Sequence, residues 1–405
     1  MIDLEQARDA VLEQAIPLEV ERVALREALG RYLAEDASTA EPVPGFDNSA
    51  MDGFAVRAAD TCGAGPDAPV ALRLAGDSRA GHPAVAALAP GEAIQISTGA
   101  AIPPGADAVV RVEATRSEAD RVLVREEVAS GRDVRRAGED IRPGRAVLRA
   151  GARIGPAELG VLASLGEAVV ACRRRPRVCA LTSGDELIEP GEELRPGAVR
   201  NSNAYSIPAL AQLAGAEVTV AGPAGDEPEA TRAAIEPALD FDVAVLCGGV
   251  SVGEHDHVKG ALAELGVEER FWGVALKPGR PTWFGTRGGT LVFGLPGNPV
   301  SAMVTFMLFV RPALALLSGG RPPAARTTAT LSRELERRRG RVEAVRCRLE
   351  LREVGWLALP AEHQGSHVLT SMLGADCLAL IPSGSGTVRA GERVEVVLLD
   401  AASLA

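Results

Sequence analysis

The middle of the chain repeats one order of segments between residues 178 and 317: a continuous apolar run, a polar glycine-rich loop, and a stretch with helical spacing. The apolar runs cover residues 178–181, 217–221, 242–247 and 291–293, and helices are expected at about 203–214, 228–238 and from 300 onward. Strands that are apolar on both faces belong to parallel sheets that helices cover on both sides. The pattern therefore predicts a three-layer α/β/α domain with a mostly parallel sheet over residues 173–320.

The segments on either side of this domain have a different texture. Helical spacing of apolar residues predicts helices over 3–15 and 19–35, and a further helix from about 155 to 166. Between about residues 46 and 147, short β-like runs alternate with Gly/Pro turns, which indicates a β-rich domain. After a linker at 318–326, the rest of the chain alternates with period two, which is typical of a small antiparallel barrel or sandwich.

Length, charge and cysteine usage exclude several classes of protein. The chain has 405 residues, enough for about two to four domains, and its net charge of −11 argues against a nucleic-acid or membrane-surface binder. Its six cysteines are scattered without a C-x-x-C pair, which suits the reducing cytoplasm and gives no zinc-like spacing. Arg311 and Pro312 favour a buried core helix over a membrane span for residues 300–317.

Four polar, glycine-rich loops follow the predicted strands, at residues 182–186, 225–226, 248–256 and 297–301. The carboxyl ends of parallel strands meet at one edge of the sheet, where ligands of α/β proteins bind. Glycines let backbone N–H groups approach an anion, and the start of a helix adds partial positive charge. Chain reversal alone explains any one of these loops equally well, but the four together indicate a binding site.

Charged side chains near these loops favour a phosphorylated ligand. Asp226 and Asp256 are carboxylates beside a predicted phosphate site, where they most naturally hold Mg²⁺. Lys277 and Arg280 flank a Pro-Gly turn and would offset a polyanionic ligand, although both could also be solvated surface charges. Two of the 43 basic residues are lysines, a skew that coding bias explains for Lys259, whereas the turn gives Lys277 a specific reason.

Residues 249–253 match the G-x-S-x-G nucleophile elbow, which would make Ser251 the nucleophile of a serine hydrolase. An elbow serine leads directly into a helix, whereas here a charged loop follows at 254–257. The candidate triad histidines, His363 and His367, belong to the C-terminal β segment. The hydrolase is therefore the less favoured interpretation.

Ten short segments run in order over nearly the whole chain: DNSAMDGF at 47–54, STGA at 97–100, PPGAD at 103–107, GED at 138–140, SGDEL at 183–187, RNSN at 200–203, GGVSVG with its following aspartate at 248–256, KPGRP at 277–281, LPGNPVS at 295–301 and QGSH at 364–367. Together they resemble, almost word for word, the molybdopterin molybdenumtransferase family, which includes MoeA and the gephyrin E domain.

The resemblance implies an elongated homodimer of four domains. These are a helical domain split into 1–45 and 146–172, a β-rich domain at 46–145, an α/β/α molybdopterin-binding domain at 173–320, and a C-terminal β-barrel at 325–405. It also implies the reaction, in which adenylylated molybdopterin and molybdate give molybdenum cofactor and AMP with Mg²⁺. The molybdopterin adenylyltransferase is then an expected transient partner, and no nucleic acid or membrane is expected.

The resemblance also assigns roles to residues. Asp226 and Asp256 would hold Mg²⁺ and the phosphates, Lys277 would neutralise the pyrophosphate, and Glu186 would line the pterin-nucleotide pocket. Further substrate-binding positions in the same domain are Ser183, Gly184, Asp185, Gly249, Ser251, Gly297 and Asn298. Three more, from the β-rich domain, would reach the site across the dimer: Asp52, Thr98 and Asp140.

The positions associated with molybdate are Arg280, Ser301, Arg346 and Ser366. Arg280 stands where the family has a second lysine, which keeps the charge and alters the geometry, and Phe54 replaces a common tyrosine. Two alternatives share the central fold. A molybdopterin adenylyltransferase consists of the α/β domain alone, and the long additions at both ends argue against it; a non-catalytic scaffold or anion-binding module would carry a long linker or partner domain, which is missing here.

Overall fold

A computed structural model describes residues 1–225, 227–250, 257–322 and 326–399 of the chain. The chain divides into two compact units. The main unit consists of Met1–Glu35, Gly151–Gly155 and Val170–Ala405, and the second unit consists of Asp36–Ala150 and Pro156–Val169.

The main unit is built on a six-stranded sheet with the order β16-β13-β17-β21-β20-β18. The bounds are β13 Arg177–Thr182, β16 Glu217–Val220, β17 Val243–Cys247, β18 Glu268–Trp272, β20 Trp283–Arg287 and β21 Thr290–Leu295. The first four strands in the spatial order are parallel, and β20 and β18 add antiparallel at the far edge. Both β17 and β21 are buried over their whole length, as their continuous apolar sequence predicts.

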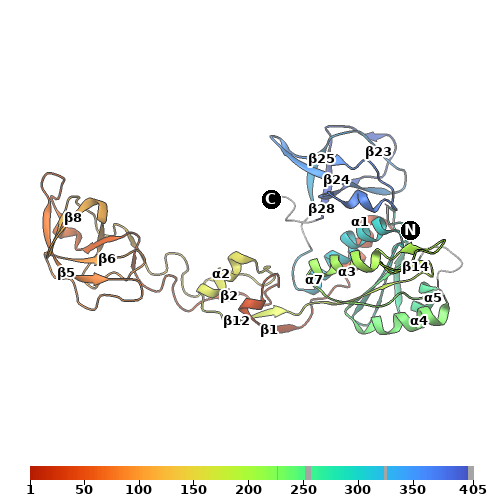
Figure 1. The fold of residues 1–405 in the computed structure, drawn as a ribbon, viewed down its shortest axis with the longest axis horizontal. Coiled ribbons are helices and arrows are strands. Elements are labelled where there is room, and N and C mark those ends of the chain that lie inside the picture. The colour runs from red at the N-terminus through yellow and green to blue at the C-terminus, as the bar shows by residue number, and fades with distance from the viewer. Residues whose placement is uncertain (226, 251–256, 323–325, 400–405) are drawn as a thin grey trace. The chain divides into compact units, whose positions relative to one another are not determined.

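Helices cover both faces of this sheet (Figure 1). On one face lie α1 Leu4–Leu12, α3 Asn203–Leu213, α6 Pro299–Thr305 and α7 Arg311–Leu317. On the other face lie α4 Pro228–Ile235 and α5 Val258–Glu264. The expected three-layer α/β/α domain with a mostly parallel sheet is therefore confirmed.

The long apolar segment Pro299–Leu317 is a core helix of this domain. It is long and apolar enough to cross a membrane, but 83% of its most apolar window is buried inside the main unit. A π-turn over Phe306–Val310 joins α6 to α7. Pro312 explains the π-turn, because its ring excludes the carbonyl of the residue four positions earlier. The guanidinium of Arg311 donates to the carbonyls of Leu398 and Leu399 at 2.9 Å each.

The C-terminal region closes into a five-stranded barrel with the order β24-β25-β22-β28-β26. Its strands are β22 Arg326–Leu331, β24 Val342–Arg352, β25 Gly355–Pro360, β26 Cys377–Ile381 and β28 Arg393–Leu398. The expected barrel is confirmed, except that β22 and β25 run parallel. A short strand of the α/β part, β19 Leu276–Lys277, pairs with β24 in parallel and joins the barrel to the sheet domain.

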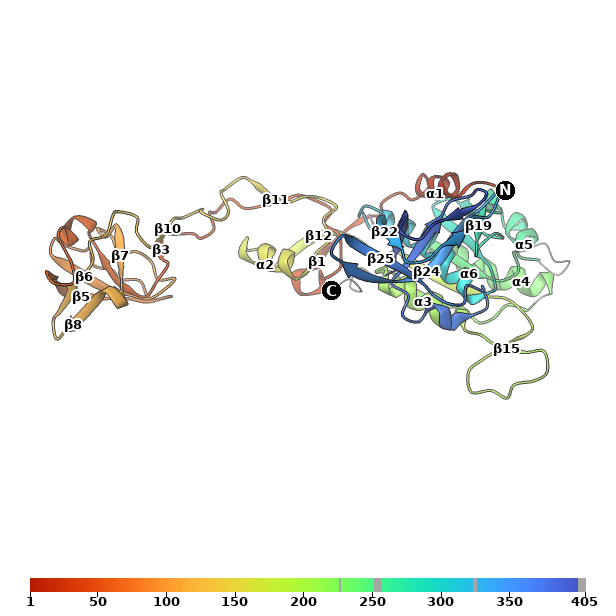
Figure 2. The same cartoon turned by 90° about the horizontal axis from the view of Figure 1, so that it is seen from above.

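The second unit contains a six-stranded sheet with the order β7-β4-β6-β5-β9-β8. Figure 2 labels four of its strands, β5, β6, β7 and β8. Its strands are β4 Gly53–Val56, β5 Val70–Ser78, β6 Glu92–Ile96, β7 Ala108–Arg111, β8 Thr115–Glu118 and β9 Arg121–Val124. The short pairs are β2 Ala37–Ser38 with β11 Ala146–Leu148, and β3 Asn48–Ser49 with β10 Val134–Arg135. The expected β-rich domain is confirmed, and α2 Pro156–Ser164 is the helix expected near residues 155–166.

The helix expected over residues 19–35 is wrong. The structure has β1 Val20–Ala24, followed by a 3₁₀ turn at Leu25–Glu27. The strand pairs with β12 Val169–Arg173, far away in the sequence, and this long-range pairing overrides the local helical spacing. The helix expected over residues 3–15 is α1, which begins at Leu4 and ends at Leu12.

Candidate functional site

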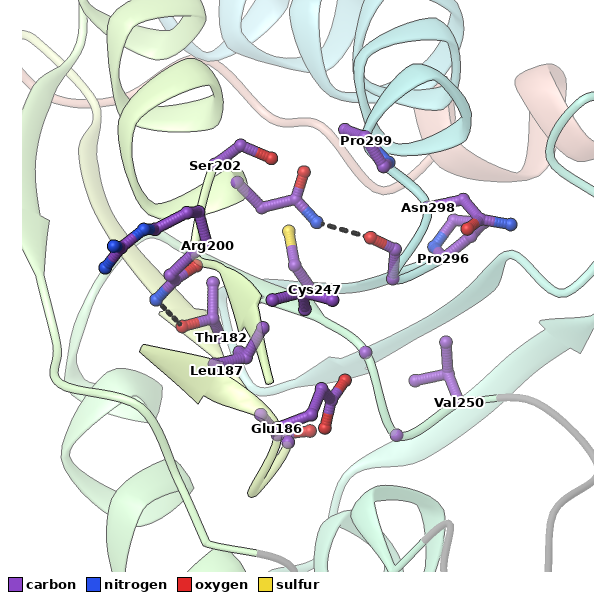
Figure 3. A pocket seen from close by; sticks show the side chains of 18 of the residues that line it. Thr182, Glu186, Leu187, Arg200, Ser202, Cys247, Val250, Pro296, Asn298 and Pro299 are labelled. Atoms are coloured by element: carbon purple, nitrogen blue, oxygen red, sulfur yellow. Dashed lines mark hydrogen bonds between the residues drawn. The ribbon is translucent and has the colours of Figure 1, made fainter. Parts of the chain in front are cut away.

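The polar loops at the carboxyl edge of the parallel strands line one cavity of about 700 Å³, which we call the first cavity. Six of the residues predicted to bind substrate lie on its walls: Ser183, Gly184, Glu186, Gly249, Gly297 and Asn298. Figure 3 shows Arg200 and Thr182 on one side, Asn298 with Pro296 on the other, and Cys247 between them. The sheet topology thus brings three of the four predicted loops to one place.

Glycines allow the loops to pack closely enough to form this cavity. Gly248 has a φ of +101°, and a Cβ there would lie 2.6 Å from the carbonyl oxygen of Ser183. Gly249 has a φ of +64°, and a side chain on it would collide with Val258. A side chain at Gly248 would push the loops after β13 and β17 apart, and one at Gly249 would press against the start of α5.

Two asparagines that the sequence analysis did not single out hold the cavity together. The amide of Asn201 donates to Thr182 Oγ1 at 3.0 Å, and that of Asn203 donates to the Gly297 carbonyl at 2.7 Å (Figure 3). These bonds tie the start of α3 to the ends of β13 and β21. Both asparagines belong to the RNSN segment at 200–203, which resembles a family motif, but the motif alone assigns no role to them.

Cys247 lines the first cavity, and its side chain is buried. Burial raises the pKa of its thiol to about 12, so the thiol is protonated at neutral pH.

A second cavity of about 630 Å³ adjoins the first, and the two share Pro281, Pro296, Asn298 and His367. It brings together four residues that sequence reasoning placed near the pyrophosphate or molybdate: Lys277, Arg280, Ser301 and Ser366. The amide of Asn298 donates to Ser366 Oγ at 3.2 Å, which connects the β21 loop to the barrel loop. Cations beside hydroxyl groups are the chemistry that binds an oxyanion.

The Lys277 ammonium in this cavity already has a carboxylate partner. It forms an ion pair with Glu343, which stands directly opposite in the β19–β24 pairing. The Glu343 side chain is only 15% exposed, and Arg338 lies 3.9 Å from its other oxygen. Sequence reasoning missed Glu343, because its position beside Lys277 depends on a pairing between strands 66 residues apart.

The turn that carries Lys277 and Arg280 is pressed against α6. Gly279 has a φ of +121°, and a Cβ there would lie 2.5 Å from Thr305 Cγ2. This close approach requires glycine, and it fixes the direction in which the turn presents its two cations.

Arg346 lies behind the second cavity, off the walls of both cavities. It is 1% exposed; its guanidinium donates to Ser371 Oγ at 3.2 Å and to the carbonyls of His363 and Gly365 at 3.4 and 3.3 Å. Burial lowers the pKa of this guanidinium from its ordinary value. In this structure Arg346 holds the loop that carries Ser366, and its direct contact with molybdate stays a prediction.

The remaining predicted residues lie elsewhere. In the second unit, the backbone N–H of Thr98 donates to the Asp52 carboxylate at 2.8 Å, so these two are neighbours, and the Asp140 backbone N–H donates to the Val43 carbonyl. Asp185 belongs to the β13 loop but not to the cavity walls. Three predicted residues lie outside the described residues: Asp226, Ser251 and Asp256.

Two further hypotheses concern the chemistry of the site, namely a nucleophilic serine and a bound metal ion. Ser251, the nucleophile of the elbow hypothesis, lies outside the described residues between β17, which ends at Cys247, and α5, which begins at Val258, so that hypothesis stays a prediction. Among the described residues no three His, Cys, Asp or Glu side chains gather as a metal site. The donors near the sheet edge, such as Glu186 and Ser183, are oxygens, which suit Mg²⁺ better than zinc.

The fold and the two cavities define an α/β protein with a polar pocket at the sheet edge and a cation-lined pocket beside it. The chain belongs to the MoeA family. Its residues 2–166 match the MoeA N-terminal region (domain I and II), residues 179–316 match a probable molybdopterin binding domain, and residues 328–399 match the MoeA C-terminal region (domain IV).

Three relatives match nearly the whole chain. It is 38% identical over 404 residues to a molybdopterin molybdenumtransferase of Haemophilus influenzae, covering 98% of both chains. It is 39% identical over 383 residues to molybdopterin molybdenumtransferase 2 of Mycobacterium tuberculosis, covering 92% of this chain and 94% of that one. The solved structure of the molybdopterin biosynthesis MoeA protein of Pyrococcus horikoshii OT3 has a TM-score of 0.85 at 32% identity, covering 98% of this chain and all of that one.

Proposed function

We propose that the chain is a molybdopterin molybdenumtransferase, which inserts molybdate into adenylylated molybdopterin and releases AMP. The observation that carries this proposal is the pair of adjoining cavities. One is lined by glycine-rich loops and amides, and the other by Lys277, Arg280 and two serine hydroxyls. Substrate and oxyanion could then meet at the wall that the cavities share.

The first cavity is the proposed pocket for the pterin nucleotide. Its glycines leave backbone N–H groups accessible to phosphates, and Glu186 and Asn298 offer polar contacts. Lys277, on the wall of the second cavity, would neutralise charge on the pyrophosphate as the anhydride is cleaved. Cleaving an anhydride depends on positioning and charge neutralisation more than on a protein nucleophile, which agrees with the protonated Cys247 thiol.

Mg²⁺ belongs to this proposal as the metal held by Asp226 and Asp256, and it would supply further neutralisation of the phosphates. The second cavity is the proposed molybdate site, with Arg280, Ser301 and Ser366 on its walls. A tetrahedral dianion is well matched by cationic and hydroxyl donors.

We also propose that the chain acts as a homodimer in the cytoplasm. In such a dimer Asp52, Thr98 and Asp140 would complete the site from the partner subunit, and the hydrogen bond between Thr98 and Asp52 supports treating them as one group. The four-domain division with boundaries near 45, 146, 173 and 325, and a transient contact with a molybdopterin adenylyltransferase, are parts of the same proposal.

The test is an assay with adenylylated molybdopterin, Mg²⁺ and molybdate. We expect AMP release that depends on molybdate. AMP release at the same rate without molybdate would contradict the proposal. Consumption of ATP to adenylylate free molybdopterin would instead identify an adenylyltransferase; the matches at 2–166 and 328–399, which flank the molybdopterin-binding region, speak against it.

A further inference from the structure

A third cation lines the second cavity in addition to Lys277 and Arg280. Arg341 lies on its wall, directly before β24. It belongs to a strongly basic run, because four of the five residues at 337–341 are arginines. In a chain with a net charge of −11, a local concentration of positive charge is what attracts an anion to one place.

The strand pairing fixes where Arg341 stands. The backbone N–H of Val342 donates to the Ala275 carbonyl at 2.9 Å, and Leu276 and Lys277 pair with Val342 and Glu343. Arg341 is the residue directly before β24, so the pairing of Val342 with Leu276 places it beside the start of β19. The pairing that sets Glu343 against Lys277 therefore also brings Arg341 to the cavity.

The charges of Lys277 and Arg341 are balanced differently. Lys277 forms its ion pair with Glu343. Arg341 is half-buried, and its side chain forms no hydrogen bond or ion pair with any residue that the structure describes. A guanidinium with no carboxylate partner among the described residues keeps its full charge available to an anion in the cavity.

We propose that Arg341 is a third cationic ligand of molybdate in the second cavity, and that Arg341 and Arg280 together supply the charge that no described carboxylate already pairs with. This inference rests on the proposed function of the cavity. The planar fork of the guanidinium donates two parallel N–H bonds to a tetrahedral oxyanion. Lys277 contributes to oxyanion binding only when its ammonium leaves Glu343 and pairs with the ligand instead.

The experiment measures equilibrium binding of molybdate alone by calorimetry, in the full chain. We expect Arg341→Ala to weaken binding at least tenfold, and Arg341→Lys, which keeps the charge but not the fork, to recover part of the loss. The matched control is Arg339→Ala, which removes the same charge from an exposed neighbour outside the cavity. We expect it to change the dissociation constant less than twofold. Affinity for AMP should be the same in all three variants.

Three outcomes would overturn the inference. The first is an Arg341→Ala variant that melts like the wild type and binds molybdate as tightly as Arg339→Ala does. The second is an equal loss of molybdate affinity in Arg341→Ala and Arg339→Ala, which would show that only the net charge of the basic run matters. The third is the absence of molybdate binding by the wild type. The proposed function fails separately, when AMP release from adenylylated molybdopterin does not depend on molybdate while Arg341 still governs binding of the oxyanion.

Discussion

The two cavities of the main unit share part of their walls but are built from different material. The first is shaped by backbone: glycines at positive φ let two loops touch, and asparagine amides tie the strand ends together. The second is lined by charged side chains on a turn and by Arg341, the residue directly before the barrel strand β24. A pocket shaped by the backbone is expected to lose its shape and its ligand affinity when a Cβ is added. A pocket that binds through charged side chains is expected to lose affinity when a cation is removed. This difference predicts distinct effects for substitutions in each.

The largest effect is expected from removing a charge in the second cavity. Lys277→Ala should lower AMP release about 100-fold or more, the range found when one preorganised donor to a developing charge is lost. Its effect on stability should be small, because the Lys277 side chain is 37% exposed and Arg338, 3.9 Å away, still faces the Glu343 carboxylate that loses its partner. Lys259→Ala removes the other lysine and should leave the rate near that of the wild type. Near-normal turnover of Lys277→Ala would contradict the role given to it.

A Cβ in the first cavity should reduce nucleotide affinity and stability together. Gly248→Ala places a side chain at a φ of +101° and against the Ser183 carbonyl, which we expect to cost about 1–3 kcal/mol of unfolding free energy. Gly266→Ala is the matched control, since its φ is +76° and a Cβ there meets nothing within 4 Å. Weaker AMP binding in Gly248→Ala alone would support the backbone-built pocket, and equal binding in both variants would refute it.

Arg346 should behave unlike Arg341, although both are arginines near the second cavity. Arg346→Met leaves the His363 and Gly365 carbonyls without their donor inside the protein, which should lower the unfolding free energy by about 1–3 kcal/mol. Arg341→Ala should leave it unchanged, because its guanidinium has no described partner. Urea denaturation of both variants measures this contrast. A stable Arg346→Met protein would show that its hydrogen bonds to the loop contribute little.

The smallest effect on activity is expected at Asp242, which lies directly before β17, at the end of the parallel strands away from the cavities. Burial raises the pKa of this carboxyl, but hydrogen bonds from Arg174 and from the Arg177 backbone N–H outweigh burial, so the pKa lies below its ordinary value. A carboxyl with a lowered pKa stabilises the fold above its unfolded pKa of about 3.9, and this contribution disappears as the pH falls through the lower folded value.

Asp242→Asn should therefore cost about 1–3 kcal/mol at neutral pH and flatten the acid limb of the stability curve. It should leave AMP and molybdate affinities unchanged, because Asp242 is remote from both cavities. Chemical denaturation between pH 2.5 and 7 tests this. An acid limb identical to that of the wild type would contradict the assignment.

The loops of the first cavity could be predicted from sequence because their signals are local. Each apolar run ends in a glycine-rich loop, and parallel strands place such loops at one edge whatever the details of packing. The helix predicted over residues 19–35 is wrong because β1 forms by pairing with β12, which is distant in the sequence. Local spacing of apolar residues does not show such a pairing.

By itself, the sequence determined the order of strands, glycine loops and helices, the family motifs, and the presence of a lysine in the KPGRP turn, because each of these is a feature of neighbouring residues. Only the tertiary structure decided which charges meet. The pairing of β19 with β24 gives Lys277 its carboxylate and brings Arg341 to the same cavity, and packing places Lys259 4.0 Å from the Trp272 ring centre. The physical reason is that electrostatic partners are selected by distance in space, which periodicity along the chain does not record.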